Sequence, residues 1–229
     1  MEFYGGYQVY AESGVDLTLL RENLNRTVAE RIDDNARSLA VADAFEESGR
    51  TSGSHSHNRP RFNMLDPGPM LRQLIDHDVK VVLIGGLAMV AHGSAYITKD
   101  IDLCYGRSKE NLEALTLALA PLHPTLRGAP PDLPFRLDVP TLAAGLNFTL
   151  STDLGALDLL GEVTGIGGYE LALAQSDERH LGPLTVRVLS VDGLIVNKRA
   201  AGRPKDLNHV LELVELKKLL DAEDEDRRP

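Results

Sequence analysis

The pattern of apolar residues is most informative in residues 81–103, where two apolar segments flank a pair of glycines. An apolar run at residues 81–84 predicts a buried strand, and the glycines that follow it predict a tight turn. Apolar residues continue at helical spacing through residues 87–92, and a second apolar segment at residues 100–103 alternates with aspartates. The stretch therefore predicts a strand, a turn, a short helix, a loop and a second strand.

The rest of the chain repeats both periodicities, which predicts a mixed α/β fold (α+β). Helical spacing predicts helices at residues 15–47, 70–77, 108–120, 169–175, 190–203 and 205–220. Alternation predicts strands at residues 146–150, 156–160 and 184–189. The proline-rich residues 121–140 are predicted to be mostly loop, with a short strand near residues 135–137 as the alternative. Several glycines in residues 161–168 indicate either a segment that covers a site or a plain connector. The acidic residues 221–226 are expected to form a frayed, solubilising tail.

A shift in composition divides the chain into residues 1–63 and 64–229. Residues 48–63 are rich in glycine, serine, histidine and proline without a hydrophobic period, which predicts a linker. The first part is then an N-terminal helical extension, and the second is one folded domain that ends in C-terminal helices. The apolar stripe of the extension must pack either on this domain or on a partner chain. We expect packing within the same chain, because an exposed stripe of this length favours association.

Composition narrows the classes of function. A chain of 229 residues with 43% hydrophobic content buries one core and a small extension. A formal charge of -10 disfavours non-specific nucleic-acid binding, although a local basic patch remains compatible with it. No apolar run approaches the roughly 20 residues of a membrane span, so we expect a soluble, cytoplasmic protein without membrane partners. The single cysteine, Cys104, excludes an internal disulfide and is expected to be a small buried residue.

The glycines and aspartates of residues 81–103 indicate a binding site for anions and metals. Gly85 and Gly86 stand where a strand turns into a helix, so their backbone N–H groups are candidates to bind phosphate. Asp100 and Asp102 are two residues apart in the predicted second strand and therefore project from one face. Carboxylates beside a phosphate-binding turn form a site for a divalent metal and a triphosphate.

Asp158 is a third candidate because it is an acid between leucines in a predicted strand. An acid in this position is costly unless it is hydrogen-bonded, paired with a cation or bound to a metal. The sequence leaves a structural salt bridge open as the alternative to a functional role.

These motifs resemble the signature of the nucleotidyltransferase superfamily with a polymerase-β-type core. The resemblance depends on Gly85-Gly86, a spacing of thirteen residues, and the Asp-Ile-Asp-Leu run at residues 100–103. The run SVDGLIVNKRAAGRPKDLNHV is similar to the C-terminal part of the AbiEii-like branch, bacterial proteins often encoded as toxins. The resemblance covers roughly residues 66–220 and implies a nucleotidyltransferase-type mixed β-sheet flanked by helices.

The resemblance also implies roles for single residues. Asp100 and Asp102 would hold the metal, which is Mg²⁺ with Mn²⁺ as the alternative, and Asp158 would be the third acid. Lys198 would face the phosphates of a nucleoside triphosphate. The alternative for Lys198 is a solvated face that it shares with Arg199, Arg203 and Lys205.

The implied activity is transfer of a nucleoside monophosphate from an NTP to an acceptor hydroxyl. The acceptor stays open between a tRNA end, a protein hydroxyl and a small molecule. If the protein is the toxin of a toxin–antitoxin pair, a cognate antitoxin is an expected partner. The alternative is a catalytically inactive relative that binds nucleotide or a partner protein.

Overall fold

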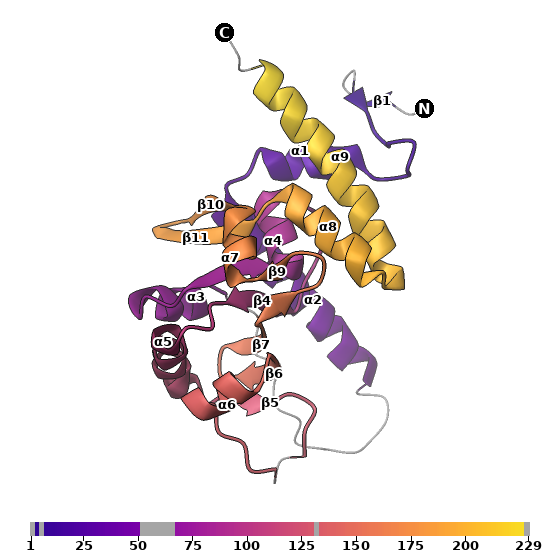
Figure 1. Cartoon of the computed structure of the whole chain (residues 1–229). Coiled ribbons are helices and arrows are strands. Elements are labelled where there is room, and N and C mark those ends of the chain that lie inside the picture. The colour runs from indigo at the N-terminus through magenta and orange to yellow at the C-terminus, as the bar shows by residue number, and fades with distance from the viewer. Residues whose placement is uncertain (1–2, 5–6, 51–66, 131–132, 227–229) are drawn as a thin grey trace.

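The computed structural model describes residues 3–4, 7–50, 67–130 and 133–226 (Figure 1), with only the backbone given for residues 3–4, 7 and 43–50. The described helices are α1 (Leu17–Leu24), α2 (Val28–Arg50), α3 (Pro67–Asp76), α4 (Gly85–His92), α5 (Lys109–Leu119), the 3₁₀ helix η1 (Ala120–Leu122), α6 (Val139–Ala144), α7 (Tyr169–Ala174), α8 (Val191–Ala201) and α9 (Pro204–Asp226). The described strands are β1 (Phe3–Tyr4), β2 (Tyr7–Gln8), β3 (Val81–Ile84), β4 (Asp100–Tyr105), β5 (Thr125–Leu126), β6 (Asn147–Thr152), β7 (Gly155–Leu160), β8 (Glu162–Val163), β9 (Gly167–Gly168), β10 (Ser176–Leu181) and β11 (Leu184–Leu189).

A mixed sheet forms the centre of the molecule, in the strand order β10-β11-β3-β4-β7-β6-β5. β4 runs parallel to β7 and β11 runs parallel to β3, whereas the other neighbouring pairs are antiparallel. Helices flank this sheet (Figure 1), which confirms the predicted mixed α/β class. None of the described helices combines the length and the apolar character that a membrane span requires.

The register between β4 and β7 places the acidic residues. Asp102 lies directly opposite Asp158, and their neighbours Leu103 and Leu159 also form a pair. Both leucines are fully buried, because alternate residues of a strand point to opposite faces of the sheet. A slip of one residue would move the leucines out of the core, so burial of the apolar face fixes the position of the acids.

The face of the sheet that carries these leucines packs under α3. Leu71 and Leu74 of α3 lie beside Leu83 of β3 and Leu103 of β4, and all of them are buried. α5 contacts both α3 and α6 and extends this layer. Ser108 caps α5 by accepting a hydrogen bond from the backbone N–H of Asn111, as its position predicts.

The helix α4 is buried along its whole length, because it contacts β3, β4, α2 and α8. Its first residue, Gly85, has a φ of 67°, a left-handed conformation that favours glycine. Gly93 ends the helix with a φ of 115°. This short connection carries the chain from β3 to the loop that enters β4.

The N-terminal extension packs on the rest of the chain, as expected from its apolar stripe. Leu20 of α1 and Ile32 of α2 are buried, and α2 contacts α4. The guanidinium of Arg31 donates a hydrogen bond of 2.8 Å to the carbonyl of Ala91 in the last turn of α4. Val41 belongs to the predicted stripe but is 55% exposed, so the stripe is narrower than its spacing predicts.

The alternative of a short strand near residues 135–137 is wrong. Residues 133–138 form neither helix nor strand, and α6 begins directly after them. The cause is local, since Asp138 accepts a hydrogen bond from the backbone N–H of Thr141 and Pro140 stands in the first helical turn. β5, in the same proline-rich segment, is absent from the sequence prediction.

Two further predictions differ from the structure. β10 was not expected, because its sequence SDERHL lacks an apolar alternation, which fits an edge strand paired only with β11. The acidic residues 221–226 are the last turns of α9 rather than a frayed tail, because that helix continues to Asp226. The predicted linker overlaps the end of α2, and its residues 51–63 lie outside the described residues.

His92, at the end of α4, predicts a pH dependence of folding stability. Its Nε2 lies 2.9 Å from the carbonyl of Leu189 and donates to it, while its Nδ1 accepts from Arg179 at 3.2 Å. Burial and the charge of Arg179 lower the pKa of His92 to about 4; the charge of Asp177 opposes this shift and that of Arg31 adds to it. The neutral ring is therefore the form that fits the fold.

We expect the free energy of unfolding to fall as the pH drops from about 6.5 towards about 4. In this window the unfolded state binds a proton at His92 and the folded state does not, which costs at most roughly 1.4 kcal/mol per pH unit. His92→Gln should flatten this dependence, because the amide does not titrate. The measurement is chemical denaturation at several pH values, with the exposed His180→Gln as control. An unchanged slope in the His92 variant would contradict the assignment.

Candidate functional site

Three aspartates from adjacent strands form one acidic cluster. Asp100 and Asp102 come from β4 and Asp158 comes from β7, and one carboxylate oxygen of each lies within 4.8 Å of the others. All three are partly buried. The structure thus brings together the acidic residues that the sequence predicts as a site.

Mutual repulsion and burial make this cluster costly without a cation. Burial, followed by the charges of Asp100 and Asp158, raises the pKa of Asp102 to about 7. Burial also raises the pKa of Asp158, and the charge of Asp100 adds to that shift. Carboxylates in such surroundings are stabilised as anions when an opposite charge lies among them.

The glycine pair makes room for this cluster. A Cβ on Gly85 would overlap the carboxylate of Asp102, and the backbone N–H of Gly86 donates a hydrogen bond to the same carboxylate. A Cβ on Gly86 would lie 2.5 Å from the hydroxyl oxygen of Thr98. Close packing therefore requires both glycines, and their predicted contact with phosphate stays a prediction. A substitution of Gly86 would disturb this packing as well as any bound ligand.

A short relay from α2 orients Asp100. The buried Asn35 accepts a hydrogen bond of 2.9 Å from the backbone N–H of Thr98 and donates one of 3.1 Å to its carbonyl. The hydroxyl of Thr98 in turn donates to Oδ1 of Asp100 at 2.9 Å. An amide that binds both backbone groups of one residue holds that residue rigidly, so α2 fixes the loop that enters β4.

Lys198 of α8 is buried near Asp102 of the cluster. Its side chain is 6% exposed, and its Nζ lies 3.7 Å from Oδ1 of the buried Asp206. Burial lowers the pKa of Lys198, while the charges of Asp206 and Asp102 oppose this shift. Lys198 is thus not part of a solvated face, and its charge acts on both Asp206 and Asp102.

Asp206 is itself held by α8 and α9. Arg203 donates to Oδ2 of Asp206 at 2.8 Å, and Nδ1 of His209 lies 3.6 Å from Oδ1. Although burial raises the pKa of Asp206, Arg203 and Lys198 hold it below its ordinary value. Among the residues that the structure describes, Nδ1 of the buried His209 has no hydrogen-bond partner. Asp206 thereby anchors Lys198 in position beside Asp102.

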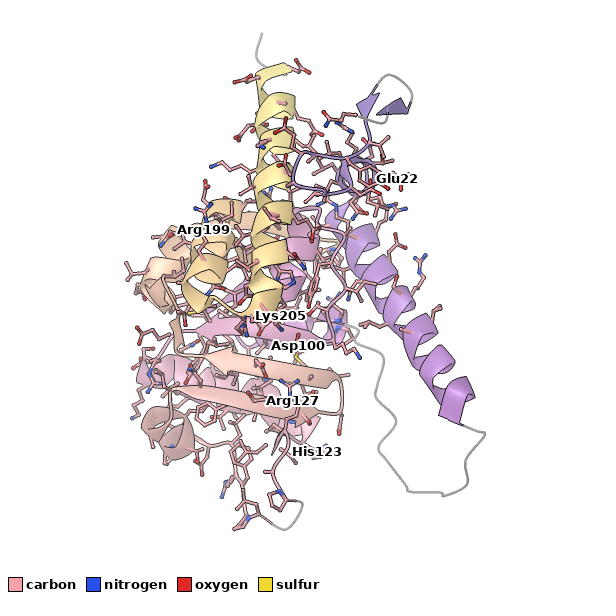
Figure 2. The ribbon with its side chains drawn as sticks, turned by 90° about the vertical axis from the view of Figure 1, so that its right-hand side faces the viewer. Glu22, Asp100, His123, Arg127, Arg199 and Lys205 are labelled. Carbon is pink, nitrogen blue, oxygen red and sulfur yellow. The ribbon has the colours of Figure 1, made fainter. Side chains whose placement is uncertain are left out.

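Arg127 forms the one ion pair that the described residues make with the cluster. It follows β5, and its Nη2 lies 2.5 Å from Oδ1 of Asp158. Its charge lowers the pKa of Asp158 and so opposes the effect of burial. Figure 2 shows Arg127 and Lys205 on either side of Asp100, on a face where the sheet meets α9.

A cleft of about 450 Å³ opens beside the cluster, between the sheet and α8. Gly85, Asp102, Asp158 and Lys198 line one part of it. The remaining lining residues are Ile84, Asn147, Phe148, Thr149, Leu159, Leu160, Thr164, Asn197, Ala200, Ala201 and Arg203. Carboxylates, a buried lysine and a helix N-terminus therefore face one cavity.

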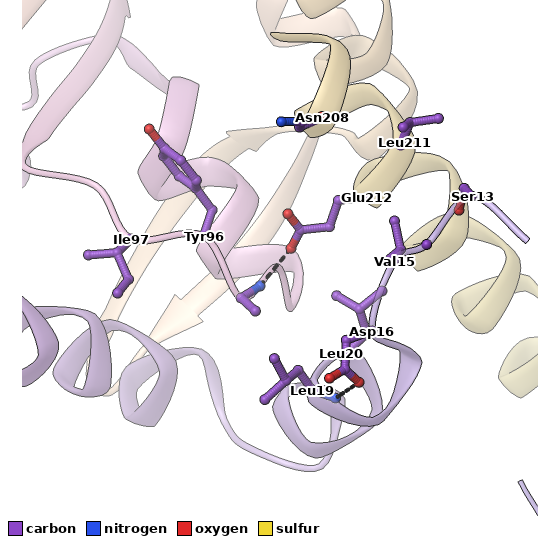
Figure 3. Close-up of a pocket in the computed structure, with 12 residues that line it drawn as sticks. Ser13, Val15, Asp16, Leu19, Leu20, Tyr96, Ile97, Asn208, Leu211 and Glu212 are labelled. Atoms are coloured by element: carbon purple, nitrogen blue, oxygen red, sulfur yellow. Dashed lines mark hydrogen bonds between the residues drawn. The ribbon is translucent and has the colours of Figure 1, made fainter. Parts of the chain in front are cut away.

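A second hollow, of about 570 Å³, lies between α1, α9 and the loop after α4 (Figure 3). Both acids that line it are already engaged. Asp16 caps α1 through the backbone N–H groups of Thr18 and Leu19, and Glu212 accepts from Ala95 at 2.8 Å. Among the described residues, the acids of this hollow do not belong to a group of three that could hold a metal, which distinguishes the hollow from the cleft.

No protein-family model matches this chain, and no curated protein does so either. The function is therefore inferred from the geometry of the acidic cluster and the cleft.

The donor set fits a hard divalent cation. Magnesium prefers carboxylate oxygens and commonly binds one or two of them together with substrate phosphates. The oxygens of Asp100, Asp102 and Asp158 are close enough to share one ion or to flank a pair. The raised pKa of Asp102 indicates the same need for positive charge.

Four residues of the site are absent from the sequence prediction: Asn35, Thr98, Arg127 and Asp206. Thr98 carries a weak signal, because a hydroxyl two residues before an aspartate often bonds to it. Asp206 follows Lys198 across a helix break that hides their contact. Asn35 and Arg127 give no signal, since tertiary packing alone brings them to the site.

Asp102→Asn tests whether the cluster binds a metal. At pH 8, without metal, this variant should be more stable than the parent. The reason is that the pKa of Asp102 is raised from 3.8 to about 7 in the folded state, so stability is lost as the pH rises from 3.8 to about 7, and the full cost is present at pH 8. Added Mg²⁺ should stabilise the parent and have much less effect on the variant.

The measurement is thermal unfolding at pH 8 with and without Mg²⁺. Asp76→Asn, an exposed acid at the end of α3, is the matched control and should respond like the parent. An equal response to Mg²⁺ in Asp102→Asn would show that the ion binds elsewhere.

Proposed function

We propose that this protein is a metal-dependent nucleotidyltransferase with a fold of the polymerase-β type. It transfers a nucleoside monophosphate from an NTP to an acceptor hydroxyl and releases pyrophosphate. The observation that carries the proposal is the cluster of Asp100, Asp102 and Asp158, whose oxygens lie within 4.8 Å of one another beside the cleft. Phosphoryl-type transfer requires mainly positioning and charge stabilisation, which such a cluster supplies with a metal.

Mg²⁺ or Mn²⁺, held by the three aspartates, would neutralise phosphate charge and make the acceptor hydroxyl more acidic. The protein residues divide the remaining work. Asp100 and Asp102 position the triphosphate side of the centre, and Lys198 supplies a cation for phosphate oxygens. A bond forms between the acceptor oxygen and the α-phosphorus, and the bond from that phosphorus to the bridging oxygen of the β-phosphate breaks.

In this proposal Asp158 either holds the metal that activates the acceptor hydroxyl or takes the proton from that hydroxyl itself. Its raised pKa makes it a better base than an ordinary aspartate. Arg127 would then be released from Asp158 or remain beside it as a contact for the acceptor. The backbone of Gly85 and Gly86 keeps its predicted role as a contact for the triphosphate.

The acceptor is proposed as a tRNA end, a protein hydroxyl or a small molecule. The charge of -10 disfavours a long nucleic-acid track, although Arg127, Arg203 and Lys205 flank the acids. A role as the toxin of a toxin–antitoxin pair, with an antitoxin as partner, is a narrower form of the proposal. It depends on the resemblance to AbiEii-like proteins.

The second candidate function is nucleotide binding without transfer. The ion pair between Arg127 and Asp158 favours it, because a guanidinium satisfies the third acid in place of a metal. Nucleotide binding without turnover in the presence of Mg²⁺ would support this alternative.

Incubation with each labelled NTP, Mg²⁺ and a cell extract should label one class of acceptor. Asp100→Asn and Asp158→Asn should abolish the label, because the amide removes the carboxylate charge that would hold the metal. The similar size of the amide should leave the fold intact. Asp158→Asn should still bind NTP, whereas Asp76→Asn should behave like the parent in both assays. Labelling by either cluster variant at the parental rate would contradict the proposal.

Lys198→Met should weaken NTP binding by about tenfold to a hundredfold, the equivalent of one charge-assisted hydrogen bond of roughly 1.5–3 kcal/mol. Methionine conserves the buried volume, so the loss reports on charge. Lys198→Arg should restore binding only in part. Calorimetry measures the affinities, and Arg199→Met, exposed on the same helix, is the control. If Lys198→Met binds NTP with the affinity of the parent, Lys198 does not contact the phosphates and α8 is not part of the phosphate site.

A further inference from the structure

Two side-chain amides line the cleft beside the hairpin of β8 and β9. Asn147 lies on β6, beside the last residue of β7, and Asn197 lies on α8 next to Lys198. Both line the cleft that also contains Asp102 and Asp158. The hairpin of β8 and β9 follows β7, and Thr164 and Gly165 between its strands contact α8.

Each amide is fixed by one backbone hydrogen bond. Oδ1 of Asn147 accepts from the backbone N–H of Gly161 at 3.1 Å, so its Nδ2 is left as a donor. Nδ2 of Asn197 donates to the carbonyl of Thr164 at 2.9 Å, so its Oδ1 is left as an acceptor. In each case the backbone partner identifies the oxygen and the nitrogen of the amide, because an N–H must meet the oxygen and a carbonyl must meet the nitrogen. The cleft therefore presents one oriented donor and one oriented acceptor.

Apolar residues also line the cleft. Leu160 of β7 lines the sheet side of the cleft, and Ala200 and Ala201 line the side of α8. Gly165 in the hairpin packs against α8, since a Cβ there would lie 2.6 Å from the Cβ of Ala200. The hairpin thus closes the cleft beside the amides. An apolar slot with hydrogen-bonding groups at its edge suits a flat heterocycle.

We infer that this slot binds the nucleobase of the NTP, and that Asn147 and Asn197 select the base by reading its donor–acceptor edge. The inference rests on the proposed function, because the acids and Lys198, which line the same cleft, would hold the phosphates. Asp158 and Leu160 are two residues apart in β7, which corresponds to about 6.6 Å along a strand. The ribose of a nucleotide fits this interval.

The residues that line the cleft favour the nucleotide, rather than the acceptor, as the molecule that binds there. Asp100 and Arg127 contact the same cluster but do not line the cleft. Arg127 pairs with Asp158 without lining the cleft, so an acceptor hydroxyl can approach Asp158 from the side of Arg127. The cleft therefore holds the donor nucleotide, and its two amides discriminate among bases.

Calorimetry with non-hydrolysable analogues of the four NTPs, in the presence of Mg²⁺, tests this inference. The parent should prefer one nucleotide by about tenfold, the equivalent of one to two hydrogen bonds. Asn147→Asp keeps the acceptor for Gly161 and replaces the donor in the cleft by an acceptor. It should lower the affinity for all four analogues through its charge and also change their order.

Asn197→Ala is the second variant, and it should reduce the preference about threefold to tenfold. Asn208→Ala, an exposed amide of α9 at the second hollow, is the matched control and should keep the parental order. Circular dichroism checks that each variant is folded. Equal affinity of the parent for all four analogues, or an unchanged order in both cleft variants, would overturn the base pocket alone. Absence of binding of any nucleotide would overturn the proposed function together with the base pocket.

Discussion

Repulsion among three carboxylates on adjacent strands is the constraint around which this structure is organised. The apolar faces of β4 and β7 fix the register, and that register brings Asp102 opposite Asp158. The core thus stabilises a geometry that the acids themselves oppose. The raised pKa of Asp102 records the cost of this arrangement. Gly85 permits the close approach, and the helix N-terminus beside it offers the first compensating partial charge.

The two cations near the cluster compensate it in different ways. Lys198 is buried and shares its charge between Asp206 and Asp102, so it is a fixed part of the site. Among the described residues Arg127 forms its ion pair with Asp158, and its side chain is 32% exposed. A buried cation with a buried partner cannot leave without exposing an uncompensated charge, whereas a partly exposed guanidinium can exchange its partner for water. Asp158 is therefore the acid of the cluster whose cationic partner can be exchanged.

Local chemistry explains how much of this site the sequence predicts. The aspartates lie in strands with a strict alternation of apolar residues, and their shared face follows from a period of two. Whether β4 would lie beside β7 depends on strand order, which a single sequence does not reveal. Lys198 was predicted from a resemblance, but its burial depends on Asp206, which lies beyond a helix break. β10 and α6 were missed because a polar edge strand and a capped short helix lack a hydrophobic period.

The N-terminal extension is the part of the chain whose contribution is hardest to see in the sequence. Its apolar residues predict packing, and α2 does pack on α4. Its polar residue Asn35 acts in a more specific way, because it binds both backbone groups of Thr98, whose hydroxyl holds Asp100. A metal-binding carboxylate needs a second layer of hydrogen bonds to fix its orientation. In this chain that layer comes from a helix more than sixty residues upstream, so the extension completes the acidic cluster as well as covering the core.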